Sequence, residues 1–83
     1  MKLEQRFIDE LKRMEYRKLG EENLYELIVE LTSIEGALGN LEAPSEEESQ
    51  ELKTVSDFVD FLNNVSDADQ ELDYDWINEQ LRK

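Results

Sequence analysis

The sequence predicts an all-α protein, a small four-helix bundle with helices at about 3–18, 21–38, 45–65 and 67–82. Large apolar residues recur at steps of three and four along most of the chain, which places them on one face of a helix. The three Gly and the one Pro fall at or near the boundaries of these stretches. Because 83 residues have room for one hydrophobic core, we expect a single acidic helical domain over residues 1–83.

The first two helices are predicted from two apolar stripes. The first stripe consists of Leu3, Phe7, Leu11 and Met14. The second consists of Leu24, Leu27, Ile28, Leu31, Ile34 and Leu38. Gly20 separates the two stripes, and Gly39 suits the position just beyond a helix end. Because the connection is short, we expect these two helices to pack antiparallel against each other.

The third helix has the clearest start. Pro44 bars a helix through the preceding loop, and Ser45 with Glu48 forms the Ser-x-x-Glu pattern of a capping box. The stripe that follows consists of Leu52, Val55, Phe58, Val59, Leu62 and Val65. Thr54 and Asp57 form a second pair of the capping type, so residues 45–65 could be one helix or two. We favour one.

The fourth helix is predicted for "SDADQELDYDWINEQL", which has an acidic residue at every second position from Asp67 to Asp75. A calcium loop of the EF-hand type starting at Asp67 would require Gly at its sixth position and Glu at its twelfth. Leu72 and Asn78 occupy those positions. A disordered acidic tail would not contain five large apolar residues in ten. The interpretation that remains is a fourth helix whose acidic residues face the solvent.

The composition limits which catalytic groups and metal sites the chain can form. The chain has no Cys and no His, which excludes disulfides, thiolate metal sites and the commonest general base. No glycine-rich phosphate loop and no metalloprotease motif is present. We therefore expect no enzyme, no catalytic residues, no metal and no cofactor. The N-terminal stretch has no apolar segment of the signal-peptide type, and no stretch has the length of a membrane span, so we expect a cytoplasmic protein.

The formal net charge is −13, and it is unevenly distributed. Residues 1–18 hold six of the nine basic residues, whereas residues 19–81 hold eighteen acidic residues and only Lys53 as a base. A surface this negative repels nucleic acid and anionic membranes and attracts basic partners. We therefore expect a basic protein surface as the partner, including that of a nucleic-acid-binding protein, and no direct contact with nucleic acid or a membrane.

Part of the chain resembles acyl carrier proteins. Their motifs around the second and last helices are matched here by Leu19, Gly20, Leu24, Pro44, Thr54, Val55, Asp57 and Val59. Asn23 stands where that family has the serine that carries phosphopantetheine. The resemblance therefore implies a degenerate acyl-carrier-like domain, which could not carry out the carrier reaction.

The leading functional prediction is a non-enzymatic acidic protein-binding module, an inhibitor or adaptor that engages a basic site. DNA-mimic anti-defence proteins of phages and bacterial immunity proteins are similar to this chain in size, charge and helicity. Tyr25, Phe61 and Trp76 lie beside the apolar stripes and could anchor a partner. The predicted contact residues are Glu26, Glu30, Asp57, Asp60, Phe61, Asp69, Asp73, Asp75 and Trp76. The alternative is a structural homo-oligomer or a small accessory subunit, in which the first helix pairs with the acidic helices of a neighbour. The same charges could also be satisfied within one chain.

Overall fold

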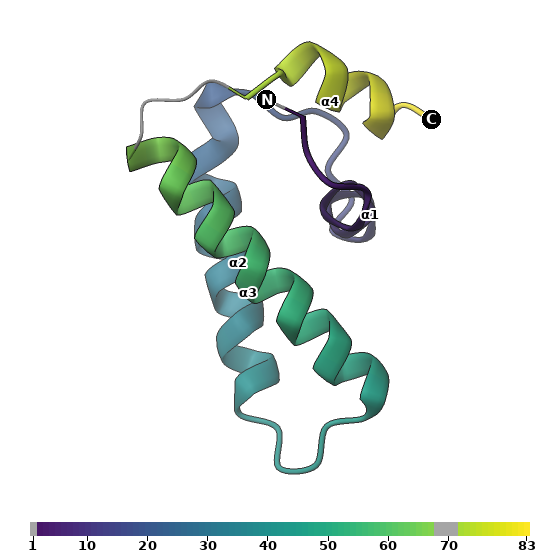
Figure 1. Cartoon of the computed structure of the whole chain (residues 1–83), viewed down its shortest axis with the longest axis vertical. Helices are drawn as coiled ribbons and strands as arrows, with labels where there is room; N and C mark the ends of the chain where they lie inside the picture. The colour runs from purple at the N-terminus through teal and green to yellow at the C-terminus, as the bar shows by residue number, and fades with distance from the viewer. Residues whose placement is uncertain (1, 68–71) are drawn as a thin grey trace.

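The computed structural model describes residues 2–67 and 72–83, and this part of the chain contains four helices and no strand. The helices are α1 (Gln5–Arg13), α2 (Glu21–Gly39), α3 (Glu46–Asp67) and α4 (Tyr74–Leu81). The predicted all-α fold with four helices is therefore confirmed. α2 and α3 form a long antiparallel hairpin, and the shorter α1 and α4 lie at one end of it (Figure 1). We call residues 21–67 the hairpin, and residues 2–20 with 72–83 the cap.

One apolar core joins the hairpin to the cap. The ring of Phe7 on α1 stacks on that of Phe58 on α3, with centroids 4.5 Å apart and ring planes 4° apart. Phe61 packs against Phe7 in a tilted arrangement at 5.8 Å. The other buried apolar side chains are Leu3, Ile8, Leu11, Leu19, Leu27, Leu31, Val55, Val59, Leu62, Val65, Leu72 and Ile77. Most of them belong to the predicted stripes, so the faces that the helices bury are those that the residue spacing indicates.

α3 begins as the sequence predicts. The Ser45 hydroxyl accepts a hydrogen bond from the Glu48 backbone N–H at 3.1 Å, and the Glu48 carboxylate accepts one from the Ser45 N–H at 2.9 Å. This reciprocal pair is a capping box, and it satisfies two backbone donors at the start of the helix. From there α3 runs to Asp67 without a break, which confirms one helix rather than two.

α1 ends at Arg13, five residues before the predicted end. Glu15 has a φ of 67°, in the left-handed region. Its N–H donates to the Lys12 carbonyl at 3.0 Å, and the Tyr16 N–H donates to the Leu11 carbonyl at 2.9 Å. These bonds form the Schellman motif, which satisfies carbonyls at the helix end and reverses the chain. The prediction that the helix reaches residue 18 was therefore wrong. The left-handed residue that ends this helix is Glu15, and a glutamate does not indicate a helix end in the sequence as a glycine does.

The connection between α1 and α2 is anchored rather than loose. Leu19 in this connection is buried. The side-chain amide of Asn78 on α4 accepts from the Leu19 N–H at 2.7 Å and donates to the Leu19 carbonyl at 3.0 Å. α1 accordingly packs on α3 and α4, and among the described helices it has no packing contact with α2. The expected antiparallel pairing of the first two helices was wrong, because the buried connection directs α1 away from α2.

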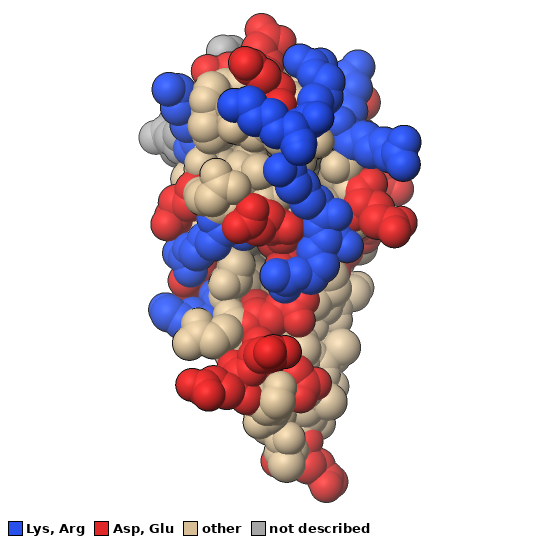
Figure 2. All heavy atoms as spheres, turned by 90° about the vertical axis from the view of Figure 1, so that its right-hand side faces the viewer, with Lys and Arg blue, Asp and Glu red and all other residues tan. Residues whose placement is uncertain are grey.

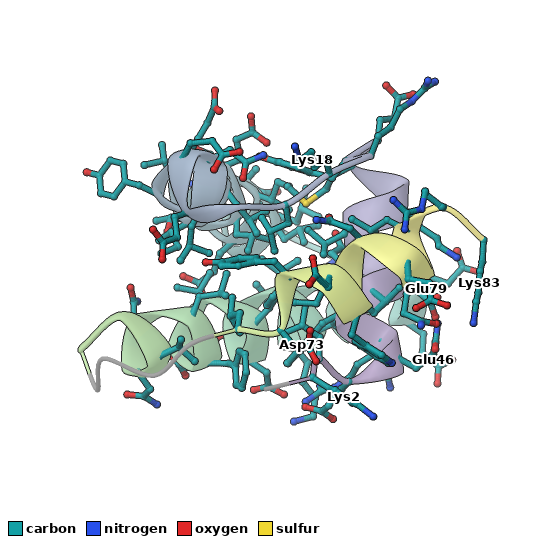
Figure 3. The ribbon with its side chains drawn as sticks, turned by 90° about the horizontal axis from the view of Figure 1, so that it is seen from above. Lys2, Lys18, Glu46, Asp73, Glu79 and Lys83 are labelled. Atoms are coloured by element: carbon teal, nitrogen blue, oxygen red, sulfur yellow. The ribbon has the colours of Figure 1, made fainter. Side chains whose placement is uncertain are left out.

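α4 begins at Tyr74, whereas the sequence predicts a start near residue 67. Asp67 is instead the last residue of α3. The Asp73 carboxylate accepts from the Trp76 N–H at 3.0 Å, and so Asp73 is the N-cap of a helix only eight residues long. From Asp73 to Lys83 this segment crosses over the end of the molecule (Figure 3). The predicted contact residue Asp69 lies outside the described residues.

Candidate functional site

Opposite charges are unevenly divided between the hairpin and the cap. The hairpin contains thirteen acidic residues and one basic residue, Lys53. The other eight lysines and arginines all lie in residues 2–18 or at 82–83. Figure 2 shows basic side chains gathered over the upper part of one face, whereas only acidic and uncharged side chains are visible toward the tip of the hairpin. The excess of negative charge therefore lies on the hairpin.

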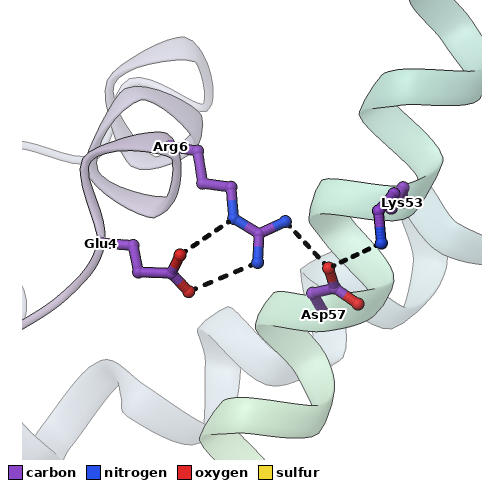
Figure 4. Close-up of polar contacts among 4 residues, drawn as sticks. All are labelled: Glu4, Arg6, Lys53 and Asp57. Atoms are coloured by element: carbon purple, nitrogen blue, oxygen red, sulfur yellow. Dashed lines mark hydrogen bonds and ion pairs between the residues drawn. The ribbon is translucent and has the colours of Figure 1, made fainter.

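Asp57 is held in an ion-pair cluster where α1 meets α3 (Figure 4). Arg6 donates from Nη1 to Asp57 Oδ2 at 2.8 Å, and Lys53 Nζ lies 3.5 Å from the same oxygen. Arg6 also pairs through Nη2 with Glu4 at 3.3 Å. The hydrogen bond from Arg6 is the main cause that lowers the pKa of the Asp57 carboxyl. Two cations of its own chain thus pair with this predicted contact residue.

A second cluster joins the same two helices. Glu10 on α1 is only 2% exposed, and its Oε2 accepts from Arg13 Nη1 at 3.0 Å. The same Nη1 lies 3.2 Å from Oε1 of Glu51 on α3. Burial raises the pKa of the Glu10 carboxyl; the charge of Arg13 opposes that shift, and Glu51 adds to it. Arg13 therefore pairs with two carboxylates, and half-buried Glu51 is engaged by its own chain.

A groove of about 720 Å³ runs between α1 and the first half of α3. It is lined by Arg6, Asp9, Glu10, Arg13, Glu46, Glu47, Gln50, Glu51 and Thr54. Because both arginines stand in the groove, they neutralise part of its acidic wall. In the part of the chain that the structure describes, no group of three or more acidic side chains is arranged to hold a metal ion. Within the groove, Arg13 pairs with Glu10 and Glu51, whereas Glu46 and Glu47 on its wall form no ion pair with a described residue.

Glu26 and Glu30 of α2 present a different picture. Both are exposed, and neither forms an ion pair with a described lysine or arginine. They line a shallow hollow of about 420 Å³ together with the connection around Tyr16. The Tyr16 hydroxyl donates to Glu30 Oε2 at 2.8 Å. Burial and this bond raise the pKa of the Tyr16 phenol well above its usual value. Neither carboxylate is therefore paired with a cation of the described part of the chain.

The aromatic residues that could anchor a partner differ in exposure. Phe61 is half-buried against Phe7. Trp76 is also half-buried, and Lys2 Nζ lies 5.6 Å from the centre of its ring. Tyr25, by contrast, is 78% exposed on the outward face of α2. Tyr25 was left out of the predicted contact residues, although its place beside the apolar stripe was the available signal.

The remaining predicted contact residues that the structure describes are on α3 and α4 and not on α2. Asp60 is exposed on α3, and Asp75 is exposed in the first turn of α4. Asp73 is also exposed, but its carboxylate caps α4. The structure thus distributes the predicted contact residues that it describes over three helices, and Glu26 and Glu30 line one hollow together.

Comparison with protein-family models, with curated proteins and with solved structures finds no match to this chain. Among the described residues, no helix combines the length and the apolar character that crossing a bilayer requires. The features of the molecule that bear on its function are therefore its surface, its charge and the side chains that its own contacts leave unused.

Proposed function

We propose that the chain is a non-enzymatic binding protein whose acidic hairpin engages a basic surface on a partner protein. The observation that carries this proposal is the number of hairpin carboxylates without a cation from their own chain. Among the described side chains of the hairpin, only Glu51 and Asp57 form ion pairs. The unpaired ones are Glu21, Glu22, Glu26, Glu30, Glu35, Glu42, Glu46, Glu47, Glu48 and Asp60.

Binding would proceed by electrostatic attraction followed by local contact. Unpaired carboxylates accelerate the encounter with a basic surface and fix its orientation. Their field reaches about 8 Å at physiological ionic strength, so the carboxylates nearest the contact dominate. Exposed Tyr25, beside Glu22 and Glu26, supplies the kind of aromatic anchor that contributes most to interface affinity.

The arrangement of the acidic residues supports an acidic inhibitor or adaptor more than a mimic of nucleic acid. The first ten residues of α2 carry four carboxylates over about 13 Å, or one per about 4.5 Å, against about 3.4 Å per phosphate in a single strand. A second dense group, Glu46 to Glu48, begins α3. Because the two helices are antiparallel, these groups lie at opposite ends of the hairpin (Figure 1) and form no continuous row.

The test is affinity capture with matched charge variants. In the hairpin variant, Glu21, Glu22, Glu26 and Glu30 are changed to Gln. In the control, four cap carboxylates are changed to amides, so the net charge changes equally: Asp9, Glu15, Asp75 and Glu79. We expect the hairpin variant to lose a captured basic protein that the control retains, and added salt to release it from the unmodified chain. Equal retention by both variants contradicts the proposal. If the unmodified chain displaces DNA from the captured protein, that result would favour the DNA-mimic hypothesis instead.

The other readings have less support. Two of the three basic residues of α1 that would pair with a neighbouring copy, Arg6 and Arg13, are engaged by α3 of their own chain. At the place of the carrier serine, the Asn23 amide accepts from the Gly20 N–H at 2.8 Å and donates to the Lys18 carbonyl at 3.0 Å. Asn23 thus has a local role in starting α2, and no observation favours an acyl-carrier-like function.

A further inference from the structure

Glu10 is the only polar or charged residue that is buried among the residues that the structure describes. An ionised carboxylate loses the water that stabilises its charge when it is buried, so buried glutamates are rare and need a partner. The partner of Glu10 is Arg13, whose side chain is 59% exposed, and the pair is therefore only partly enclosed. A buried residue cannot reach a partner protein, so Glu10 acts on the packing of α1 against α3.

Glu10 and Glu51 share a single nitrogen atom of Arg13. Nη1 lies 3.0 Å from Oε2 of Glu10 and 3.2 Å from Oε1 of Glu51, so the arginine bridges α1 and α3. Because both contacts end at the same atom, this bridge also brings two carboxylates close together. Two ionised carboxylates at one site repel each other, and the repulsion disappears when one of them takes up a proton. Burial raises the pKa of Glu10, the charge of Arg13 lowers it, and the charge of Glu51 and a hydrogen bond with Glu51 raise it further.

We propose that Glu10, Arg13 and Glu51 form a pH-sensitive contact between cap and hairpin, in which a proton on Glu10 replaces Arg13 as the link. At neutral pH, Arg13 bridges the two ionised carboxylates and holds α1 on α3. In mild acid, a proton from the solvent neutralises Glu10, whose carboxyl group then donates a hydrogen bond to the carboxylate of Glu51. The contact thus keeps a hydrogen bond between the two helices and loses the repulsion between the two charges.

The other charged groups around this cluster favour the proton and do not replace Arg13. The second arginine in the groove, Arg6, is held by Glu4 and Asp57. The other carboxylates that line the groove are Asp9, Glu46 and Glu47, and they add negative charge around Glu10. α4 also packs on α1, but none of its residues lines the groove, and its acidic residues Asp75 and Glu79 are exposed. The carboxylates of α2 lie outside this cluster, so the proposed function does not bear on it.

The sign of the pH dependence follows from the burial of Glu10. Its pKa is raised in the folded protein, so its ionised form opposes the packing of α1 at neutral pH, and this opposition fades as the pH falls through the raised value. The Arg6–Asp57 pair has the opposite dependence, but the pKa of Asp57 is lowered, so that pair weakens only in stronger acid. Mild acid therefore isolates the effect of Glu10. With nine residues, α1 is marginal alone and opens more readily than the long helices of the hairpin.

The first test is amide hydrogen exchange of α1, corrected for the intrinsic pH dependence of exchange. In the unmodified chain, protection of α1 relative to the middle of α3 should rise severalfold from neutral pH to about pH 5. Glu10→Gln, which imitates the protonated carboxyl, should have the higher protection at both pH values. Glu47→Gln removes an exposed carboxylate from the same groove and should behave like the unmodified chain. An unmodified chain without this rise, or a Glu10→Gln variant that retains it, would overturn the proposal.

The second test asks whether the proton replaces the arginine. Arg13→Gln should reduce the protection of α1 severalfold at neutral pH and much less at about pH 5, where the proton links the helices. In the Glu10→Gln background, the same substitution should have a small effect at both pH values. Arg17→Gln removes an exposed arginine that forms no ion pair with a described residue, and it should have a small effect that does not vary with pH. A loss in Arg13→Gln that mild acid does not restore contradicts the proposal.

Discussion

The hairpin and the cap are built from helices of different length and are held by different interactions. α2 and α3 have 19 and 22 residues, whereas α1 and α4 have nine and eight. Helices shorter than about 12 residues are marginal alone, so the cap depends on its contacts with the hairpin. These contacts are specific and polar at Arg6 and Arg13, whereas most of the described hairpin carboxylates form no ion pair. The cap thus uses two of its arginines for contacts within the fold, whereas most of the described hairpin carboxylates have no cation of their own chain beside them.

The largest expected effect on stability comes from Phe58, the hairpin residue whose ring stacks on the cap. Phe58→Ala removes a fully buried ring that stacks on Phe7 of the cap, and should lower the free energy of unfolding by about 3–5 kcal/mol. Such a loss is a large part of the stability of a small domain. Urea unfolding should show helix content and Trp76 fluorescence falling together. Loss of the Trp76 signal alone would mean that the hairpin folds without the cap, and Phe61→Ala, at a half-buried site, should cost less.

The next effect concerns the polar anchor of the cap. Asn78→Ala leaves the N–H and the carbonyl of buried Leu19 without their partner, which should cost about 2 kcal/mol. Hydrogen exchange at the Leu19 amide should accelerate, while amides in the middle of α3 remain protected. Asn64→Ala, on the exposed side of α3, serves as the control and should change stability by less than about 0.5 kcal/mol. Equal effects of the two variants would show that the connection is not anchored by Asn78.

A smaller effect of opposite sign is expected at the end of α1. Glu15→Gly replaces a residue for which the left-handed conformation is unfavourable by one that adopts it without a steric cost. The substitution should therefore stabilise the protein by about 1 kcal/mol. The thermal midpoint should rise accordingly. Glu15→Ala removes the same charge but keeps the Cβ, so it should not reproduce the gain. If the alanine variant is as stable as the glycine variant, charge rather than backbone conformation explains the result.

The two ion-pair clusters should respond to pH in opposite directions. The pKa of Glu10 is raised in the folded protein, so its ionised form lowers stability above that pKa, and this cost disappears as the pH falls toward the ordinary value. Glu10→Gln should therefore be more stable than the unmodified chain at neutral pH, and the difference should vanish in acid. Urea midpoints measured from neutral to acidic pH test this. A constant difference would exclude titration of Glu10 as the cause.

Asp57→Asn is the counterpart with the smallest expected effect. The pKa of Asp57 is lowered, so its contribution to stability is present above the ordinary pKa and is lost as the pH falls through the lowered value. The variant should be slightly less stable than the unmodified chain at neutral pH and equally stable in strong acid. Because the Arg6–Asp57 pair is partly exposed, added salt should reduce the difference. A difference that salt does not change would indicate lost packing instead.

The sequence predicted the two helices of the hairpin well, although not their pairing, because the signals of each helix are local. The stripes that form the buried faces of α2 and α3 follow the helical period, and the Ser45–Glu48 box marks a helix start through contacts three residues apart. The cap was predicted less well. Glu15 ends α1 without the Gly or Asn that usually signals a left-handed residue, and the alternating acidic residues before Asp73 hid the start of α4.

The candidate site was predictable only in part, for a related reason. Residue counts alone place the excess of acidic charge in the hairpin. They do not reveal that Asp57 meets Arg6, 51 positions away, and thereby differs from exposed Asp60. Nor do they reveal which of three off-stripe aromatics stays exposed, since Phe61 and Trp76 are half-buried by cap residues and Tyr25 is not. Such distinctions arise from tertiary contacts.

The pairing of Asn78 with the Leu19 backbone closes a loop of 59 residues in a chain that contains no cysteine. Small domains often close loops of this length with a disulfide, whose integrity depends on the redox potential of the surroundings. Here the carboxamide of Asn78 closes the loop through reversible hydrogen bonds, and a carboxamide is not redox-active under these conditions. This closure should therefore be independent of the redox potential of the surroundings, and it can re-form after each opening without an oxidant.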